Sequence, residues 1–309
     1  NTGGVSEELE RRIREAIHQF GYTPNRTARA LKTRISKSIG LILPTIVNPF
    51  FPSLVRGIED RCNSTGYSLI LCNSDGETQK ELMYTELLLE KQVDGIILTT
   101  VGNSIETLKR LKENDMTSVI IDRKINGYNI SSVVTDNFMG ARLAMEYLLE
   151  LGMKRTVIIS GPMFLSSSRD RLKSCEKALA ERGMTFDQNL VIEGDFMYES
   201  GYTCMRKIMG KIKDFDSVFA FNDIMAIGAI EYLQEFNYRV PEDISVIGYD
   251  DIMFAGMYRP ALTTVRQPAY DMGRTAFDLL MMKLSQETVG SIDVVLKPEL
   301  IIRESTIKL

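Results

Sequence analysis

Histidine is nearly absent from this 309-residue sequence, and the single example, His18, lies close to the N-terminus. Most general acid–base schemes and most serine–histidine arrangements are therefore excluded. The glycine patterns that bind phosphate groups are also missing, because no GxGxxG, GxxxxGKS or GxxxxGKT follows a strand-like run. Aspartate and glutamate are plentiful, but they show no metal-ligand spacing. These absences predict that the protein is not an enzyme and needs no cofactor or metal.

Cysteine is scarce and scattered, with four thiols at Cys62, Cys72, Cys175 and Cys204. They form no CxxC pair and no metal-ligand spacing, which is typical of reduced thiols in a cytoplasmic protein. No run approaches the roughly 18 uninterrupted apolar residues of a membrane-spanning helix. The first residues, NTGGVSEELERR, lack the basic and apolar regions of a secretory signal. We therefore expect a cytoplasmic location and no membrane contact.

Positive charge is concentrated at the start of the chain. Residues 1–37 carry eight Lys and Arg against four Glu, a net charge of +4. Because the whole chain has 37 basic and 41 acidic residues, the remainder carries 29 and 37, a net charge of −8. A basic arm on an acidic body indicates a polyanionic partner for the arm. The alternative is a merely solvated helical surface.

Two helices are predicted within this basic arm. Residues 6–20 repeat apolar side chains at helical spacing after a capping serine. Residues 23–33, TPNRTARALKT, begin with a threonine cap and a proline suited to the first helical position. This second helix is about ten residues long, below the roughly 12–15 at which isolated helices become marginally stable in water. We therefore expect its stability to depend on a partner.

Beyond the arm, short β-branched runs alternate with helical stretches. Continuous apolar strands separated by helices are typical of parallel strands buried on both faces, and so of a doubly wound α/β fold. About ten strands are more than a single twisted open sheet usually contains. We therefore expect two similar sheets, with the chain passing from the first to the second near residue 137. Strands are expected at 39–43, 67–72, 94–98, 117–122, 132–136, 155–160, 189–195, 217–221 and 244–250, and helices near 50–65, 77–91, 104–114, 138–151, 167–182, 199–212 and 223–235.

The last part of the chain complicates a picture of two separate lobes. After a strand at 262–265, a helix is expected near 270–285, followed by strands near 292–297 and 299–303. So short a tail cannot form its own core and must complete the sheets already built. The chain is therefore expected to cross between the lobes more than once, which makes a hinge.

Polar and aromatic side chains follow many of the predicted strands. In open α/β sheets, ligands bind beyond the carboxyl ends of the strands. Carboxylates and amides accept hydrogen bonds from hydroxyl groups, and aromatic rings stack on C–H faces, so this set suits a polyhydroxylated ligand. Each residue alone could equally be a helix cap, but their joint occurrence favours a site. The residues are Asn48, Phe50, Phe51, Asn73, Asp75, Asp122, Arg123, Arg169, Arg171, Asn222, Asp223, Asp250 and Asp251.

Spaced motifs in a fixed order resemble the LacI/GalR family of transcriptional regulators over essentially the whole chain. Any one of them alone would be weak, but the series is specific. The motifs are VSEELERRIREAIHQFGYTPNRTARALKT, SIGLILPTIVNPFFPSLVRGIED, GYSLILCNSDGE, KQVDGIIL, DNFMGA, SGP, SRDRLKSCEKAL, FNDIMAIGA, VPEDISVIGYDD, RPALTTVRQP and ELIIRES.

The resemblance implies two doubly wound parallel-sheet lobes, like type I periplasmic sugar-binding proteins, joined by a hinge of several crossovers. A small all-α DNA-binding remnant would precede them and the chain would form a homodimer. The implied domains are 1–37 (partial headpiece and hinge helix), 38–137 with 268–296 (N-terminal lobe), and 138–267 with 297–309 (C-terminal lobe).

The resemblance also implies contacts with a palindromic operator. Residues 24–33 would form the hinge helix, with Leu31 as a wedge in the minor groove. The implied DNA-binding residues are Tyr22, Asn25, Arg26, Arg29, Leu31 and Lys32. The family pattern places the reading helix before Asn1, so we expect the intact protein to recognise the operator and this chain to bind DNA weakly or without specificity.

For a small effector, the resemblance implies Asp122, Arg171, Asn222 and Asp250 as sugar-binding residues and Phe196 as a stacking ring. Further candidates are Asn48, Phe50, Phe51, Arg123 and Gln267. Because two guanidinium groups could also hold a carboxylate or phosphate, a sugar, a sugar phosphate and a sugar acid remain open. The hypothesis is a repressor whose operator affinity is controlled allosterically by this effector. A sugar-binding protein for transport is the alternative, although the expected absence of a signal and the basic arm argue against it.

Overall fold

The chain divides into two units, residues 1–37 and residues 38–309. In the first unit, helix α1 (Glu7–Gln19) begins where the sequence predicts it. The Ser6 hydroxyl caps it by accepting a hydrogen bond from the Leu9 N–H at 3.4 Å. The second predicted helix of the arm, with its candidate DNA-contacting residues, lies outside the described residues. The computed structural model describes residues 6–19, 35–100, 102, 104–125, 127–286 and 290–307.

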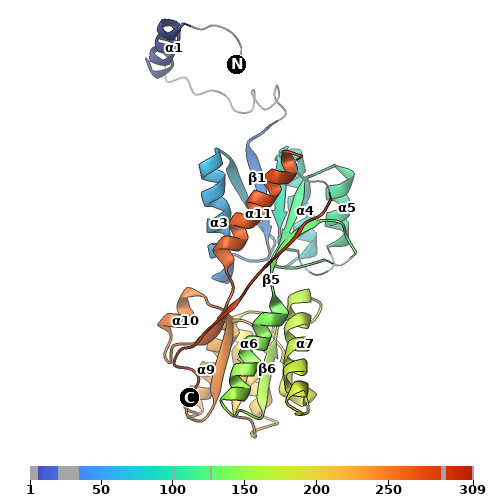
Figure 1. Cartoon of the computed structure of the whole chain (residues 1–309), viewed down its shortest axis with the longest axis vertical. Coiled ribbons are helices and arrows are strands. Elements are labelled where there is room, and N and C mark those ends of the chain that lie inside the picture. The colour runs from blue at the N-terminus through green and yellow to red at the C-terminus, as the bar shows by residue number, and fades with distance from the viewer. Residues whose placement is uncertain are drawn as a thin grey trace. The chain divides into compact units, whose positions relative to one another are not determined.

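The second unit contains two six-stranded sheets (Figure 1). The first has the order β11-β5-β4-β3-β1-β2, and all its neighbours are parallel. With its covering helices we call it the first lobe. Its strands are β1 (Ser38–Leu43), β2 (Ser68–Asn73), β3 (Gly95–Leu98), β4 (Ser118–Ile121), β5 (Ser131–Thr135) and β11 (Asp293–Leu296), and its helices are α3 (Phe50–Thr65), α4 (Thr78–Glu90), α5 (Ile105–Glu113) and α11 (Ala269–Leu284).

The second sheet, with the order β12-β10-β9-β8-β6-β7, forms the second lobe. Its strands are β6 (Thr156–Ser160), β7 (Val191–Glu193), β8 (Ser217–Ala220), β9 (Ser245–Asp250), β10 (Thr263–Arg266) and β12 (Glu299–Ile301). Its helices are α6 (Asn137–Glu150), α7 (Ser166–Glu181), α8 (Tyr198–Met209), α9 (Asp223–Glu235) and α10 (Met253–Met257), with a 3₁₀ turn at Gln188–Leu190. Helix α10 and the 3₁₀ turn are too short to show a periodic pattern in the sequence.

The expected parallel sheets are present with one exception, strand β12, which runs antiparallel to β10. The direction of β12 is set by the edge from which the chain enters the second sheet. Strand β11 is parallel to β5 and therefore ends at the same edge of the first sheet. The chain then enters the second sheet after only two residues, without the long crossover that a parallel neighbour needs.

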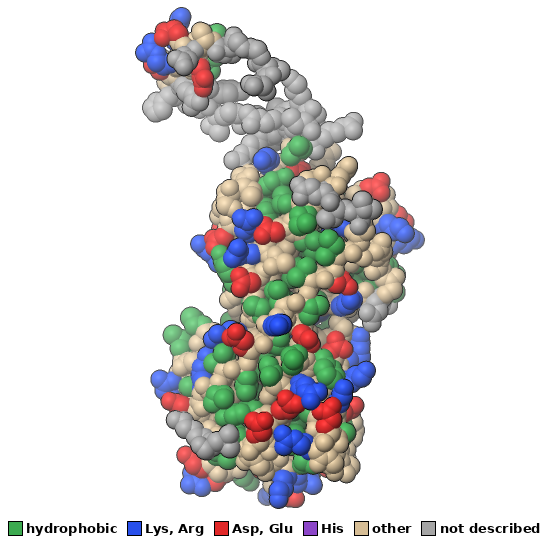
Figure 2. Space-filling view, in the orientation of Figure 1, with side chains coloured by type: hydrophobic (Ala, Val, Ile, Leu, Met, Phe, Trp, Pro, Cys, Tyr) green, Lys and Arg blue, Asp and Glu red, His purple; other side chains and the backbone are tan. Residues whose placement is uncertain are grey.

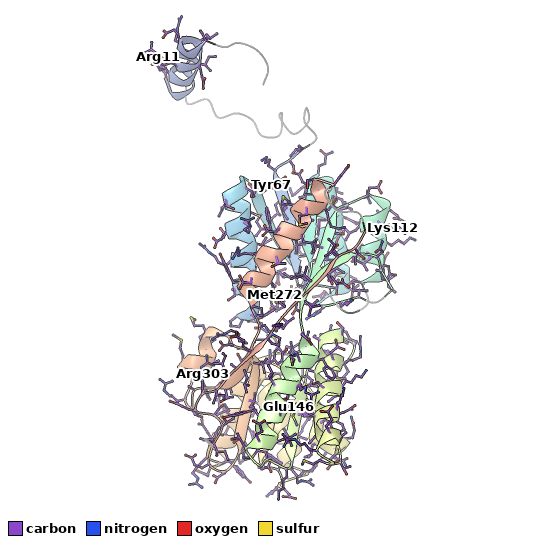
Figure 3. All side chains as sticks on the ribbon, in the orientation of Figure 1. Arg11, Tyr67, Lys112, Glu146, Met272 and Arg303 are labelled. Carbon is purple, nitrogen blue, oxygen red and sulfur yellow. The ribbon has the colours of Figure 1, made fainter. Side chains whose placement is uncertain are left out.

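Three segments cross between the lobes: β5 to α6, β10 to α11, and β11 to β12 (Figure 1). We call them the three crossings. The Asp136 N–H donates to the Leu296 carbonyl at 2.9 Å and so ties the first crossing to the third. The Thr135 hydroxyl lies 3.3 Å from the Met272 sulfur on α11, just past the second crossing (Figure 3). The hinge of several crossovers is thus present. Of the domain boundaries that we propose, 267/268 and 296/297 fall in the second and third crossings, whereas 137/138 falls one residue inside α6.

Two glycines let α11 pack directly on α3. A Cβ on Gly57 would lie 2.1 Å from the Tyr270 carbonyl oxygen, and a Cβ on Gly273 would lie 2.1 Å from that of Leu54. Only glycine permits so close an approach of the two backbones. The contact attaches the late helix α11 to the first lobe, although most of the second lobe separates α3 and α11 in the sequence.

Charge on the second unit is mixed. In the view of Figure 2, Lys and Arg side chains are interspersed with Asp and Glu over the face that is shown. Among the described residues, no helix has the length and apolar character needed to span a membrane.

Candidate ligand-binding cavity

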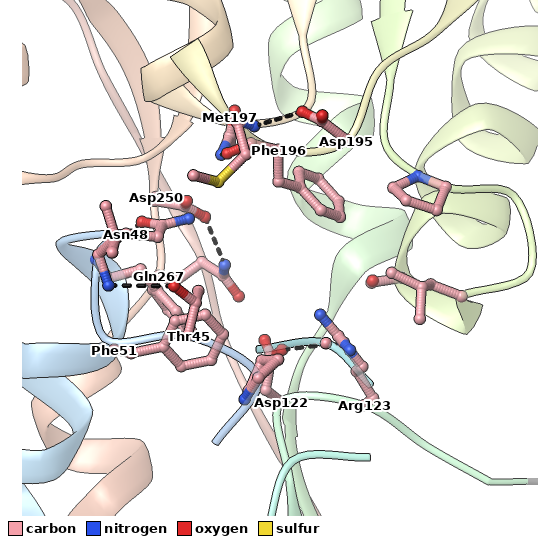
Figure 4. A pocket seen from close by; sticks show the side chains of 18 of the residues that line it. Thr45, Asn48, Phe51, Asp122, Arg123, Asp195, Phe196, Met197, Asp250 and Gln267 are labelled. Carbon is pink, nitrogen blue, oxygen red and sulfur yellow. Dashed lines mark hydrogen bonds and ion pairs between the residues drawn. The ribbon is translucent and has the colours of Figure 1, made fainter. Parts of the chain in front are cut away.

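A cavity of about 490 Å³ is lined by the loops that follow the carboxyl ends of strands from both sheets (Figure 4). The first-lobe wall is formed by the loops after β1, β2 and β4 and by the start of α3. The second-lobe wall is formed by the end of β9, by the segments after β6, β7, β8 and β10, and by α7. All ten predicted effector residues line it. They are Asn48, Phe50, Phe51, Asp122, Arg123, Arg171, Phe196, Asn222, Asp250 and Gln267.

Two buried aspartates face the cavity from opposite lobes. Asp122 and Asp250 are each 8% exposed, and both have positive backbone φ angles, 73° and 113°. Such angles are rare for residues other than glycine and cluster at functional sites. The Asp250 carboxylate accepts a hydrogen bond from the Gln267 amide at 2.7 Å (Figure 4).

Burial is the largest cause of the raised pKa of both carboxyl groups. It raises the pKa of Asp250 to about 7, although Arg171 and the hydrogen bond from Gln267 both oppose the rise. It also raises the pKa of Asp122, against the attraction of Arg123 and Arg171. Near neutral pH, Asp250 is therefore only partly ionised and can either donate or accept a hydrogen bond.

The two arginines of the cavity are already engaged with protein groups. Arg171 is 3% exposed. Its Nε donates to Asn137 Oδ1 at 2.8 Å, and its Nη1 donates to the Phe221 carbonyl. Its guanidinium carbon also lies 3.5 Å from the centroid of the Tyr249 ring, a cation–π contact.

Arg123 is held from two sides. Its Nη1 donates to the Thr100 carbonyl at 2.7 Å, and its Nε lies 3.4 Å from the Asp122 carboxylate. Each guanidinium is therefore fixed in place, with only part of its donor fork open to a ligand.

Aromatic rings form much of the remaining wall. Phe50 and Phe51 pack edge to face with centroids 5.2 Å apart. Phe196 has a φ of 69°, and its ring lies so close to Gly161 that a Cβ there would be 2.0 Å from its Cζ. Rings held in this way present rigid apolar faces to the cavity.

Comparisons with known proteins identify the family and the fold of this chain. Residues 145–306 match the family model described as a periplasmic binding protein-like domain. The HTH-type transcriptional regulator RegA of Clostridium saccharobutylicum is 37% identical over 98% of this chain and 92% of RegA. The ribose operon repressor of Halalkalibacterium halodurans is 35% identical over 98% of this chain and 90% of the repressor. A LacI family transcriptional regulator from Enterococcus faecium, solved with bound ribose, is 30% identical with a TM-score of 0.80 and covers 88% of this chain and 99% of that structure.

The chain belongs to the LacI family of transcriptional regulators. Membership confirms the resemblance, the two-lobed periplasmic-binding-protein-like fold and the regulatory function expected from the sequence. The relatives are regulators and repressors rather than enzymes, and they favour regulation over transport. LacI-family repressors act on operator DNA.

Not every strand-end residue of this LacI-family chain reaches the cavity. Asp75 lines it. Asp223, in contrast, is fully buried and accepts hydrogen bonds from Thr264 at 2.5 Å and from the Ile252 N–H at 2.8 Å. Asp251 forms ion pairs with two arginines of β10 and the C-terminal segment. These two carboxylates stabilise the second lobe through hydrogen bonds and ion pairs, and neither is the helix cap that the alternative interpretation expected.

The remaining two strand-end residues have local partners. Arg169 donates to the carbonyl groups of Met163 and Phe164, and the Asn73 amide donates to Asp75 at 2.5 Å. Asn222 combines both roles, because it lines the cavity and also caps α9 by accepting from the Met225 N–H at 2.9 Å.

Sequence reasoning missed the side chains that the connecting loops contribute. Val47 and Phe164 line the cavity from opposite lobes and are 70% and 61% exposed. Asp195 and Met197 flank Phe196 in the loop after β7 (Figure 4). Val47, Phe164 and Met197 are apolar and do not directly follow a predicted strand, although the nearby motifs NPFF and SGP mark two of these loops. Asp195 ends the predicted strand at 189–195 and could have been found by its position.

Proposed function

We propose that this LacI-family regulator is a repressor that binds a neutral sugar-like effector in the cavity, and that occupancy of the cavity sets its affinity for a palindromic operator. The observation that carries the proposal is the pair of buried aspartates, Asp122 and Asp250, that face one cavity from the two lobes. A ligand that bonds to both would favour approach of the lobes.

The lining suits the hydroxyl groups and the C–H faces of a sugar ring. The Gln267 amide donates one hydrogen bond to the Asp250 carboxylate. A carboxylate has about four lone-pair sites, so further sites on Asp250 can accept hydrogen bonds from the hydroxyl groups of a ligand. The Gln267 Oε1 atom is itself buried and finds no hydrogen-bond partner within the described part of the chain. Phe51 and Phe196 supply rings for stacking (Figure 4).

The charge of the lining favours a neutral effector over a sugar phosphate or sugar acid. Four carboxyl groups line the cavity, against two arginines that each already contact protein groups. An anion would be repelled by those carboxyl groups that are ionised, with Asp250 only partly ionised near neutral pH, and would share the two guanidinium groups with their protein partners. The four carboxyl groups belong to Asp75, Asp122, Asp195 and Asp250.

Isothermal titration calorimetry tests the effector class. The probes are D-ribose, D-xylose, D-glucose and D-galactose, with ribose 5-phosphate and gluconate as anionic counterparts. D-ribose comes first because one relative is a ribose operon repressor and another was solved with bound ribose. We expect at least one neutral probe to bind and Asp122→Asn to weaken it, whereas the exposed control Asp214→Asn leaves binding unchanged. Binding of the anionic probes alone would refute a neutral effector, and binding of none would refute a sugar-binding cavity.

Self-association is the second part of the proposal. Helix α10 exposes three apolar side chains, Met253 at 66%, Phe254 at 44% and Met257 at 64%, and Figure 2 shows apolar side chains where Figure 1 places α10. Contiguous exposed apolar side chains often mark an interface. We infer that a second copy covers this surface in a homodimer.

DNA contacts are assigned to the basic arm. The residues proposed from the family pattern are Tyr22, Asn25, Arg26, Arg29, Leu31 and Lys32, which lie outside the described residues. The mixed charge on the face of residues 38–309 that Figure 2 shows agrees with a DNA contact made by the arm.

A further inference from the structure

We propose that Asn137 transmits effector occupancy from Arg171 to the crossings between the lobes, as a positioning residue that is not itself part of the cavity wall. The inference rests on the proposed function, because it assigns a regulatory link to the same cavity.

The link consists of two consecutive hydrogen bonds. Arg171, on α7 of the second lobe, lines the cavity. Its Nε donates to Asn137 Oδ1 at 2.8 Å, and Asn137 Nδ2 donates to the Thr135 carbonyl at 3.1 Å. Thr135 is the last residue of β5 in the first lobe. A single amide therefore connects a cavity cation in one lobe with the end of a strand in the other.

Asn137 lies at the end of the first crossing, and its neighbour Asp136 connects it to the third crossing. It is the first residue of α6 and is 7% exposed. The preceding residue, Asp136, donates its N–H to the Leu296 carbonyl of the third crossing and caps α6 by accepting from the Met139 N–H. A displacement of Asn137 would therefore change the positions of residues in both the first and the third crossing.

The second crossing is connected to the cavity without an intermediary. Gln267 belongs to this crossing, lines the cavity and donates to Asp250. The cavity thus contacts the crossings at two places, directly through Gln267 and indirectly through Arg171 and Asn137. Only the indirect route passes through a side chain that can be changed without altering the cavity lining.

Arg171 keeps other anchors if the Asn137 amide is removed. Its Nη1 still donates to the Phe221 carbonyl, and its guanidinium still lies over the Tyr249 ring. Loss of Asn137 should therefore leave Arg171 in the cavity while breaking its connection to Thr135. This separation lets binding and transmission be measured independently.

The test compares three variants with the wild-type chain. Asn137→Ala removes both hydrogen bonds of the link. Asn137→Asp keeps an acceptor for Arg171 but removes the donor to Thr135. Ser174→Ala is the matched control, because Ser174 Oγ bonds α7 to the Phe138 carbonyl of α6 at 2.7 Å without involving Arg171. Each protein is titrated by calorimetry with D-ribose, D-xylose, D-glucose and D-galactose.

Hydrogen exchange of peptides covering 135–139 and 296–299 then reports on the crossings with and without a sugar that the wild type binds. We expect both Asn137 variants to bind it within about threefold of the wild-type Kd, a difference well below the 1.4 kcal/mol of a tenfold change. They should lose the sugar-induced change in exchange that the wild type and Ser174→Ala show.

Three results would overturn the inference. A full exchange response in Asn137→Ala would show that the link is not used. A tenfold or larger loss of sugar affinity in both Asn137 variants would make Asn137 part of the binding site. A sugar that binds the wild type without changing exchange at the crossings would show that there is nothing to transmit. Binding of no sugar by the wild type would instead refute the proposed function, on which the inference rests.

Discussion

Replacing Asp250 by asparagine should make the protein more stable at alkaline pH while weakening its sugar binding. Folding raises the pKa of this carboxyl group from an ordinary value near 3.8 to about 7, chiefly through burial. Between these two values the unfolded chain has lost a proton that the folded chain retains. The wild-type free energy of unfolding should therefore fall as pH rises through this range.

The magnitude follows from the two pKa values. They differ by about three pH units, and each unit corresponds to 1.36 kcal/mol, so the ionisation of Asp250 opposes folding by at most about 4 kcal/mol above pH 7. An asparagine side chain at this position would have no such titration, could still accept from Gln267, and tolerates a positive φ nearly as well as aspartate. The variant should equal the wild type near pH 4 and exceed it increasingly up to pH 8.

Urea unfolding at one-unit steps from pH 4 to pH 8 measures this difference, with equal m values required in the two proteins. Asp214→Asn, at an exposed carboxylate outside the cavity, controls for the removal of one charge. Parallel stability curves for the wild type and Asp250→Asn would refute the reasoning, because Asp250 would then titrate alike in the folded and unfolded states.

Three further changes test other parts of the core, and a fourth tests the arm. Asp122→Asn should weaken binding of a neutral sugar about 10- to 150-fold by calorimetry, since hydrogen bonds to charged groups contribute about 1.5–3 kcal/mol, and an unchanged Kd would remove Asp122 from the site. Gly273→Ala should lower the free energy of unfolding by about 1–3 kcal/mol, because its Cβ would lie 2.1 Å from the Leu54 carbonyl oxygen, and an unchanged melting temperature would contradict that packing. Met257→Glu should shift the chain from dimer to monomer in analytical ultracentrifugation, whereas an intact dimer would place the interface elsewhere. Leu31→Ala in the intact protein should weaken operator binding in a gel-shift assay without changing sugar affinity, and equal operator affinity would exclude the wedge role.

Much of the fold follows from the sequence because strands buried on both faces leave an unbroken apolar run. Residues 39–43 of β1 are fully buried or nearly so, and the pattern locates this strand within one residue. The direction of β12 could not be predicted, since it depends on where β11 ends in space and not on any property of its own three residues. Helix α10 was missed because five residues show no period.

Part of the cavity was predictable from the positions of residues at strand ends, whereas Phe196 and Gln267 were expected only from the family resemblance. Asp122 directly follows β4 of the first sheet and Asp250 ends β9 of the second, and ligands of open α/β sheets bind beyond the carboxyl ends of the strands, so the place of each follows from the α/β pattern. Asp251 directly follows Asp250 yet turns to Arg266 and Arg303, and the sequence motif YDD does not distinguish the two aspartates. Phe164 lies in a loop whose path depends on local carbonyl contacts with Arg169, which no spacing rule encodes.

The central claim, that a sugar in the cavity controls operator binding, is tested most directly by measuring the coupling between the two ligands. Fluorescence anisotropy gives the affinity of the intact protein for labelled operator with and without saturating sugar, and calorimetry gives sugar affinity with and without operator. Because coupling is reciprocal, the account predicts the same factor from both directions, in the range of about 5- to 150-fold. Operator affinity that stays unchanged when the cavity is saturated would contradict it.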